Sequence, residues 1–221
     1  MTIIKKSDEE EFSEFFIRQN AVPIYSTLCE GAANSDTLSL LGIEKSQKVL
    51  MQSIVTEEHA KKLKVDLTYD MDIDLPDRGI ALSIPLSSIA SRQLLERIES
   101  HGPSAEDGEK IKFNDERKLN MELIYSICPK GNVAEIMKAA RAAGATGGTI
   151  IKAKGTAAEG TEKFFGMAIS NEKEIILIVT KKENRNPIMQ AIASYKSPEG
   201  LSPIAFSLPV SDVAGLRLMR D

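Results

Sequence analysis

Apolar and polar residues in the second half of the chain follow spacings that switch between strand-like and helix-like patterns. Val133, Ile136 and Ala140 recur at i, i+3 and i+7, the apolar stripe of an amphipathic helix, and Asn132 is a suitable N-cap. The pattern predicts strands at 122–128, 149–153, 174–180 and 204–208, and helices over 133–144 and from Pro187, in the first turn, to about Tyr195. This order is the split βαββαβ arrangement, an antiparallel sheet with two helices on one face.

The first half repeats parts of this pattern in the same order. The matching segments are 24–26 with 124–126, 80–84 with 174–178, 94–98 with 188–192, and 111–113 with 204–206. Four matches in one order indicate an internal repeat. We therefore predict an α+β fold with two ferredoxin-like βαββαβ domains, each an antiparallel sheet with helices on one face.

Domain boundaries follow from this comparison. Phe12, Phe15 and Phe16 lie at helical spacing, so residues 1–20 are expected to form an N-terminal helical extension. The first domain is expected over 21–113, with its first helix near 35–41. The second is expected over 120–221, including a C-terminal tail, after a linker at 114–119.

Composition narrows the class of protein. With 42% hydrophobic and 27% charged residues, the chain of 221 residues has enough apolar side chains for a core. A formal net charge of -4 gives no general attraction for nucleic acid. No apolar run approaches the roughly 20 residues of a membrane span, and the acidic N-terminus does not resemble a signal peptide, so we expect a cytoplasmic protein without membrane insertion.

The segment 144–155, GATGGTIIKAKG, resembles the glycine- and threonine-rich segment of the PII nitrogen-regulatory signalling proteins. Residues 160–166, GTEKFFG, are similar to the exposed T-loop of that family, and 206–210, FSLPV, are similar to its F-x-L-P-V ending. The resemblance covers nearly the whole second half. The first half carries the pattern without the signature, so the chain resembles a tandem PII-like repeat with a diverged N-terminal copy.

The resemblance implies a non-enzymatic signal-transduction protein that regulates an enzyme or a membrane transporter, as in nitrogen regulation. It implies a homo-oligomer, either a trimer of chains or a PII-like pseudo-hexamer, that binds ATP, ADP or AMP at clefts between subunits, with 2-oxoglutarate as co-effector. The ligand-binding residues it indicates are Thr149, Lys154, Gly155, Thr156, Arg217 and Arg220. The partner loop it indicates contains Gly160, Phe164 and Phe165.

The residue chemistry agrees with an anionic ligand. Lys154 can neutralise a phosphate, the Thr149 hydroxyl can donate and accept, and guanidinium groups at Arg217 and Arg220 suit phosphate oxygens. Structural roles are the alternative: the glycines of 144–148 can simply end a helix and begin a strand, and these charged side chains can be solvated.

Two departures from the family predict altered ligand specificity. The loop 196–203, KSPEGLSP, holds two prolines without amide donors and a glutamate that opposes a polyphosphate. Phe164 stands near the position of the family's modifiable tyrosine, which removes a hydroxyl target.

Other function classes have weaker support. Cys29 and Cys128, at comparable strand ends, are the only support for a metal-binding CutA-type tolerance protein on the same fold. Two cysteines and two histidines otherwise give no disulfide framework or zinc pattern, so we expect no metal site. The segment 69–77, YDMDIDLPD, holds four aspartates that can serve a divalent cation or an acidic loop. An enzyme is disfavoured, since no nucleophile–histidine pair, P-loop or paired carboxylates are recognisable.

Overall fold

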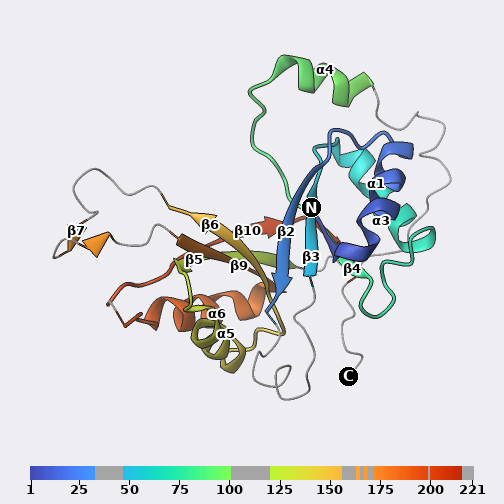
Figure 1. Cartoon of the computed structure of the whole chain (residues 1–221). Helices are drawn as coiled ribbons and strands as arrows, with labels where there is room; N and C mark the ends of the chain where they lie inside the picture. The colour runs from blue at the N-terminus through green and yellow to red at the C-terminus, as the bar shows by residue number, and fades with distance from the viewer. Residues whose placement is uncertain are drawn as a thin grey trace. The chain divides into compact units, whose positions relative to one another are not determined.

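The chain divides into two compact units. The computed structural model describes residues 1–32, 47–100, 120–155, 163–164, 167–168, 172–198 and 200–215. Unit 1 comprises Met1–Leu28, Lys48–Met121 and Pro209–Asp221, and unit 2 comprises Cys29–Gln47 and Glu122–Leu208 (Figure 1). The chain crosses between the two units four times, after residues 28, 47, 121 and 208.

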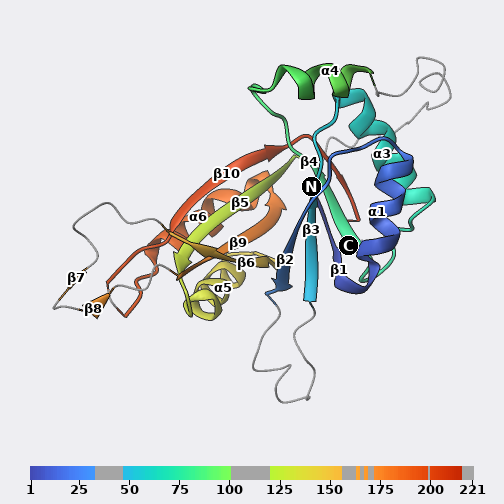
Figure 2. The same cartoon turned by 45° about the horizontal axis from the view of Figure 1, so that its top comes forward.

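Unit 1 begins with a βαββαβ sequence of elements. These are β1 (Thr2–Lys5), α1 (Glu9–Arg18), β2 (Tyr25–Gly31), β3 (Gln47–Gln52), α3 (Glu57–Tyr69) and β4 (Gly79–Ser83), followed by α4 (Arg92–Ser100) and, from the far end of the chain, β11 (Asp212–Ala214). The strand order is β2-β3-β1-β4-β11. β1 lies antiparallel between β3 and β4, while α1 and α3 lie side by side on one face of the sheet (Figures 1 and 2).

Burial of apolar side chains between helices and sheet holds unit 1 together. Phe12 and Phe15 of α1 and Ile4 of β1 are almost completely buried in one cluster with Leu63 and Leu67 of α3. Removing a side chain of this size from water stabilises the fold by roughly 1.5–3 kcal/mol. Sequence reasoning identified the apolar stripe of α1, and the structure shows that it covers the sheet.

The segment after β10 completes the sheet of unit 1. Val213 of β11 pairs with Leu82 of β4, and Ala214 joins the core cluster of unit 1. The Asp212 carboxylate accepts from the Lys64 ammonium of α3 at 2.7 Å. A strand that follows unit 2 in sequence therefore covers the β4 edge.

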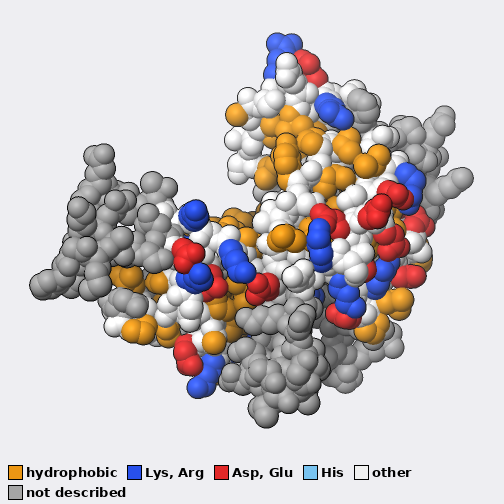
Figure 3. Space-filling view, viewed as in Figure 1, with side chains coloured by type: hydrophobic (Ala, Val, Ile, Leu, Met, Phe, Trp, Pro, Cys, Tyr) orange, Lys and Arg blue, Asp and Glu red, His pale blue; other side chains and the backbone are white. Residues whose placement is uncertain are grey.

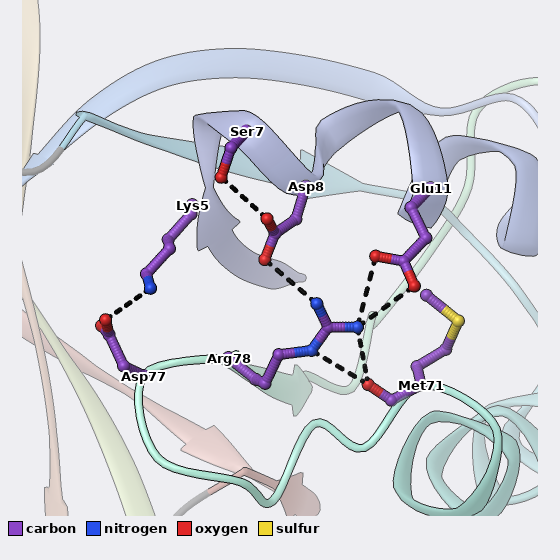
Figure 4. A network of polar contacts seen from close by, with 7 residues as sticks. All are labelled: Lys5, Ser7, Asp8, Glu11, Met71, Asp77 and Arg78. Atoms are coloured by element: carbon purple, nitrogen blue, oxygen red, sulfur yellow. Dashed lines mark hydrogen bonds and ion pairs between the residues drawn. The ribbon is translucent and has the colours of Figure 1, made fainter.

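Arg78, just before β4, ties three parts of unit 1 together (Figure 4). Its guanidinium donates to the Asp8 carboxylate, to both oxygens of Glu11 and to the Met71 carbonyl oxygen, at 3.1–3.3 Å. It also lies over the Phe12 ring, 5.4 Å from the ring centroid. The segment between α3 and β4 is thereby fastened to the start of α1.

Unit 2 has the same order of elements. These are β5 (Met121–Pro129), α5 (Val133–Ala142), β6 (Thr149–Lys154), β9 (Glu172–Lys181), α6 (Lys182–Ser194) and β10 (Ile204–Val210), with the two-residue strands β7 (Lys163–Phe164) and β8 (Met167–Ala168) between β6 and β9. The strand order is β10-β5-β9-β6, and the end of β2 pairs with β6. α5 and α6 cover one face, where Ile124, Ile176 and Ile178 meet their apolar sides (Figure 2).

The predicted fold class is confirmed, because each unit is a βαββαβ α+β fold with helices on one face of its sheet. In unit 2, the four strands and the helix after Asn132 agree with prediction within a few residues. Two details differ. α6 begins at Lys182, so Pro187 lies inside the helix and beyond its first turn, and Asn132 makes no side-chain cap bond to α5. The Asn132 side chain instead accepts from the Tyr195 hydroxyl at 2.7 Å and donates to the Pro129 carbonyl.

Unit 1 differs more from the sequence comparison. Residues 1–20, expected to form an extension, supply β1 and α1, and the strand expected first, near 24–26, is the second strand β2. The strand expected third, 80–84, is the fourth, β4, and the helix of 94–98 comes after it as α4. The boundaries 21–113 and 120–221 thus differ from the compact units. The expected helix at 35–41, strand at 111–113 and linker at 114–119 lie outside the described residues.

No helix within the described ranges is both long and apolar enough to cross a membrane.

Candidate functional site

Strand β6 carries two of the predicted ligand residues but separates them. Thr149 begins β6, is 8% exposed and pairs with Leu177, whereas Lys154 ends β6 and is exposed. Lys, Arg, Asp and Glu side chains lie interspersed over one face of the molecule (Figure 3). Five residues of strand place their Cα atoms about 17 Å apart, and an odd separation points the two side chains to opposite faces. A single copy of unit 2 therefore does not bring Thr149 and Lys154 together, while Gly155 follows directly on Lys154.

The Lys154 end of β6 lies among charged side chains. Lys154 is the register partner of Glu172 at the start of β9. The Glu172 carboxylate accepts from the Lys130 ammonium at 2.9 Å, with both side chains 55% exposed. The hydrogen bond and charge of Lys130, and the charge of Lys154, lower the pKa of Glu172, while Glu172 in turn raises the pKa of Lys130. We name Lys130, Lys154 and Glu172 the lysine–glutamate cluster.

A second carboxylate fixes the turn before α5. Glu174 accepts from the Gly131 amide at 2.8 Å, while the Lys130 amide donates to the Glu172 carbonyl at 3.3 Å. Residues at the start of β9 thus bond both the Lys130 side chain and the backbone amides of the β5–α5 turn. Sequence reasoning did not select Lys130, Glu172 or Glu174, although a lysine and a glycine before a helix and acids at a strand start are visible signals.

The loop between α6 and β10 is closed on itself. The Ser197 amide donates to the Leu201 carbonyl at 2.9 Å, and the Gly200 amide donates to the Ser197 carbonyl at 2.8 Å. The Leu201 amide donates to the buried Ser197 hydroxyl at 3.2 Å, and Lys196 donates to Ser202. The amides of Ser197, Gly200 and Leu201 are therefore all used within the loop.

Two glycines of the predicted signature, Gly144 and Gly148, have structural roles. The Gly144 amide donates to the Arg141 carbonyl where α5 ends. A Cβ atom at Gly148 would lie 3.2 Å from the Met137 sulfur and 3.3 Å from the Leu177 carbonyl oxygen. Gly148 therefore permits the close approach of α5 to β9.

Several predicted site residues cannot be placed. Thr156, Gly160, Phe165, Arg217 and Arg220 lie outside the described residues. Phe164 lies in β7, where it pairs with Met167 of β8.

The βαββαβ order of unit 2 agrees with the fold that the resemblance implies. Residues 121–220 match the family model of the nitrogen regulatory protein P-II. This P-II-like region runs from β5 to beyond β11, so it spans the second half of the chain and includes the strand that joins unit 1.

One solved structure and the curated proteins complete the comparison. A crystal structure described as that of a putative PII-like signalling protein from Thermus thermophilus is 16% identical over 43% of this chain and 88% of that chain, with a TM-score of 0.32. No curated protein matches the sequence.

The cysteines expected to support a metal-binding alternative are buried. Neither Cys29 nor Cys128 forms a disulfide, and burial raises the pKa of Cys128 to about 11. With such a pKa and no metal bound, the Cys128 thiol is protonated near neutral pH. In the described part of the chain, neither cysteine is part of a group of three or more side chains that could hold a metal ion.

The aspartates of 69–77 lie after α3, in the segment that leads to β4. Asp77 pairs with Lys5 at 2.6 Å, and Asp74 accepts from the Gly215 amide at 2.5 Å. Among the described residues, no group of three or more His, Cys, Asp or Glu side chains is arranged to hold a metal ion. The contacts of these two aspartates are structural, one to β1 and one to the end of β11.

Proposed function

We propose that the chain is a PII-like signal-transduction protein, in which occupancy by a small effector is passed to a regulated partner. The match of residues 121–220 to the P-II family is the observation that carries the proposal. The chain acts as a regulator rather than an enzyme, and regulation of nitrogen metabolism is the role that the family description suggests.

The effector is an adenine nucleotide, ATP, ADP or AMP, bound at a cleft between subunits. Lys154 and Gly155 contribute from one subunit, with Thr156, and the two arginines Arg217 and Arg220 contribute from the tail. Thr149, at the buried end of β6, is the remaining residue that the resemblance indicates. The exposure of Lys154 supports its part, because an ammonium in solvent is ready to meet a phosphate.

The partner is a transporter or enzyme that the segment between β6 and β9 contacts. Gly160, Phe164 and Phe165 form the contact, with the two phenylalanine rings as apolar anchors. Because Lys154 and Glu172 flank this segment, an effector bound at its ends is well placed to change partner contact.

The second face of the unit 2 sheet supports assembly into a trimer of chains, or a pseudo-hexamer of units. Ala205 packs on the helical side, so Phe206 points to the other face, where its ring stacks on Tyr125 with centroids 4.9 Å apart. Ile204 on the same strand is 65% exposed. An exposed apolar sheet face is typical of an interface, and size-exclusion chromatography with light scattering measures the number of chains.

Calorimetric titration tests the effector. ATP, ADP, AMP and cyclic dinucleotides are titrated into three proteins: wild type, Lys154→Ala and Lys138→Ala. Lys138→Ala is the control, because Lys138 is an exposed lysine of α5. We expect one nucleotide to bind wild type and the control alike, and Lys154→Ala to bind it roughly tenfold more weakly, as for loss of one charged hydrogen bond. Absence of binding to wild type at millimolar concentration would refute the nucleotide part of the proposal.

A further inference from the structure

The lysine–glutamate cluster joins the two strands that flank the segment between β6 and β9. Lys154 and Glu172 form the outermost pair of the β6–β9 ladder. Glu172 also holds Lys130, on the turn before α5, through its side chain at 2.9 Å and its carbonyl oxygen at 3.3 Å. One residue therefore connects β6, β9 and the β5–α5 turn.

The ion pair in this cluster is easily displaced. Exposed ion pairs contribute little to stability, since solvent screens them and side-chain entropy opposes them. Lys130 and Glu172 are each about half exposed. An anion that offers two or three oxygens to the same ammonium groups thus competes with Glu172 on nearly equal terms.

Neighbouring charges limit the size of that anion. Lys152, the next lysine inward on β6, is paired with Glu30 of β2 at 3.0 Å, and Glu174 already accepts from the Gly131 amide. A longer polyanion that extends beyond the cluster is repelled by the carboxylates of Glu30 and Glu174. The charge pattern therefore favours one compact oxyanion group over an extended polyphosphate.

We propose that the Glu172 carboxylate competes with the effector for Lys130 and Lys154. A compact oxyanion, such as a carboxylate or a single phosphate group, binds these two lysines by displacing the Glu172 carboxylate. The displacement loosens the outermost pair of the β6–β9 ladder. The inference rests on the proposed function for its effector. It adds the ligand class and the route by which binding reaches the segment that contacts the partner.

Glu172→Gln tests the proposal, because glutamine keeps the shape and removes the competing charge. Glu135→Gln is the matched control, since Glu135 is an exposed acid of α5 that faces Lys138 at 3.9 Å. Hydrogen exchange is measured without ligand at residues 152–154 and 172–174. We expect faster exchange in Glu172→Gln than in wild type or the control, and equal rates in all three would overturn the proposal.

Titration with inorganic phosphate, AMP and ATP tests the competition itself. At low salt we expect Glu172→Gln to bind phosphate and AMP roughly three- to tenfold more tightly than wild type, with ATP no better than AMP for wild type. The difference should vanish near 1 M salt, where the Debye length is about 3 Å. Saturating phosphate should also raise the exchange of wild type at 152–154 to that of Glu172→Gln.

The outcomes separate the two proposals. The competitor role is wrong if wild type and Glu172→Gln bind the same probe with equal affinity, or if ATP binds wild type more tightly than AMP. Either result leaves the proposed function standing. If no probe binds either protein, the competitor role and the effector part of the proposed function both fail. Faster exchange in Glu172→Gln would then show only a structural role for this carboxylate.

Discussion

Replacing Arg78 with methionine tests how far one side chain holds unit 1 together. The substitution keeps an apolar stem over the Phe12 ring but removes every guanidinium contact to Asp8, Glu11 and Met71. It also leaves Asp8, whose side chain is 17% exposed, with a hydrogen bond from Ser7 in place of its contact with the Arg78 cation.

The magnitude follows from the exposure of each contact. Hydrogen bonds to charged groups contribute about 1.5–3 kcal/mol when protected from solvent, and exposed pairs about 0–1 kcal/mol. The Arg78 side chain is 26% exposed and that of Glu11 is 55% exposed. Only the contacts to Asp8 and Met71 are therefore expected to contribute close to about 1.5–3 kcal/mol. We expect Arg78→Met to lower the free energy of unfolding of unit 1 by about 2–3 kcal/mol. Arg78→Lys should lose about half of that, because an ammonium cannot reach all three partners at once.

Urea titration read by hydrogen exchange and mass spectrometry follows the two units separately. The control is Arg92→Met, which removes an exposed arginine that pairs with Glu96 on α4. This control should change stability by less than about 0.5 kcal/mol. If Arg78→Met destabilises unit 1 no more than Arg92→Met does, the bridging role of Arg78 is wrong.

Three further predictions concern a buried hydroxyl, a buried histidine and a glycine with positive φ. The buried Ser126 hydroxyl has no hydrogen-bond partner among the described residues, so Ser126→Ala should raise the urea midpoint and increase stability by up to about 1 kcal/mol. Ser197→Ala should lower the midpoint, because it removes the hydrogen bond that the Ser197 hydroxyl accepts from the Leu201 amide. Burial lowers the pKa of His59, so the unfolded chain binds the proton more readily; the stability of unit 1 should be full above about pH 6.5 and fall as the pH drops toward the lowered pKa. Urea midpoints at pH 5 and 7.5 should therefore differ more for wild type than for His59→Gln. Gly215 has φ +78° and a Cβ there would clash with a carbonyl oxygen of β4, so Gly215→Ala should speed hydrogen exchange in β11, whereas Gly131→Ala, with φ +90° but open space, should leave β11 unchanged.

The local pattern of apolar and polar residues was sufficient to predict the strands of unit 2 but not the order of elements in unit 1. In unit 2, glycines and prolines separate strongly periodic segments, so each strand could be predicted from its own residues. In unit 1, the resemblance of 24–26 to 124–126 led to a comparison of β2 with β5, although β1 is the strand that occupies the position of β5. Which strand lies beside which depends on contacts between distant residues, and short apolar patterns carry no such information.

The α3 helix and the lysine–glutamate cluster show the same limit at single residues. The buried side chains of α3 are His59, Leu63 and Leu67, one for each turn, too narrow a stripe to stand out from its charged neighbours. Lys154 could be proposed from the sequence because the family signature contains it. Glu172 and Lys130 are 42 residues apart, and only the fold shows that they meet.

The docking of β11 on β4 also sets the order in which the protein can be completed during synthesis. About 130 residues separate the paired Ser83 and Asp212, and ribosomes add about 5–20 residues each second. The nascent N-terminal half therefore waits on the order of ten seconds with an open strand edge that invites pairing with other chains. The sheet of unit 1 is therefore complete only after translation has passed Ala214.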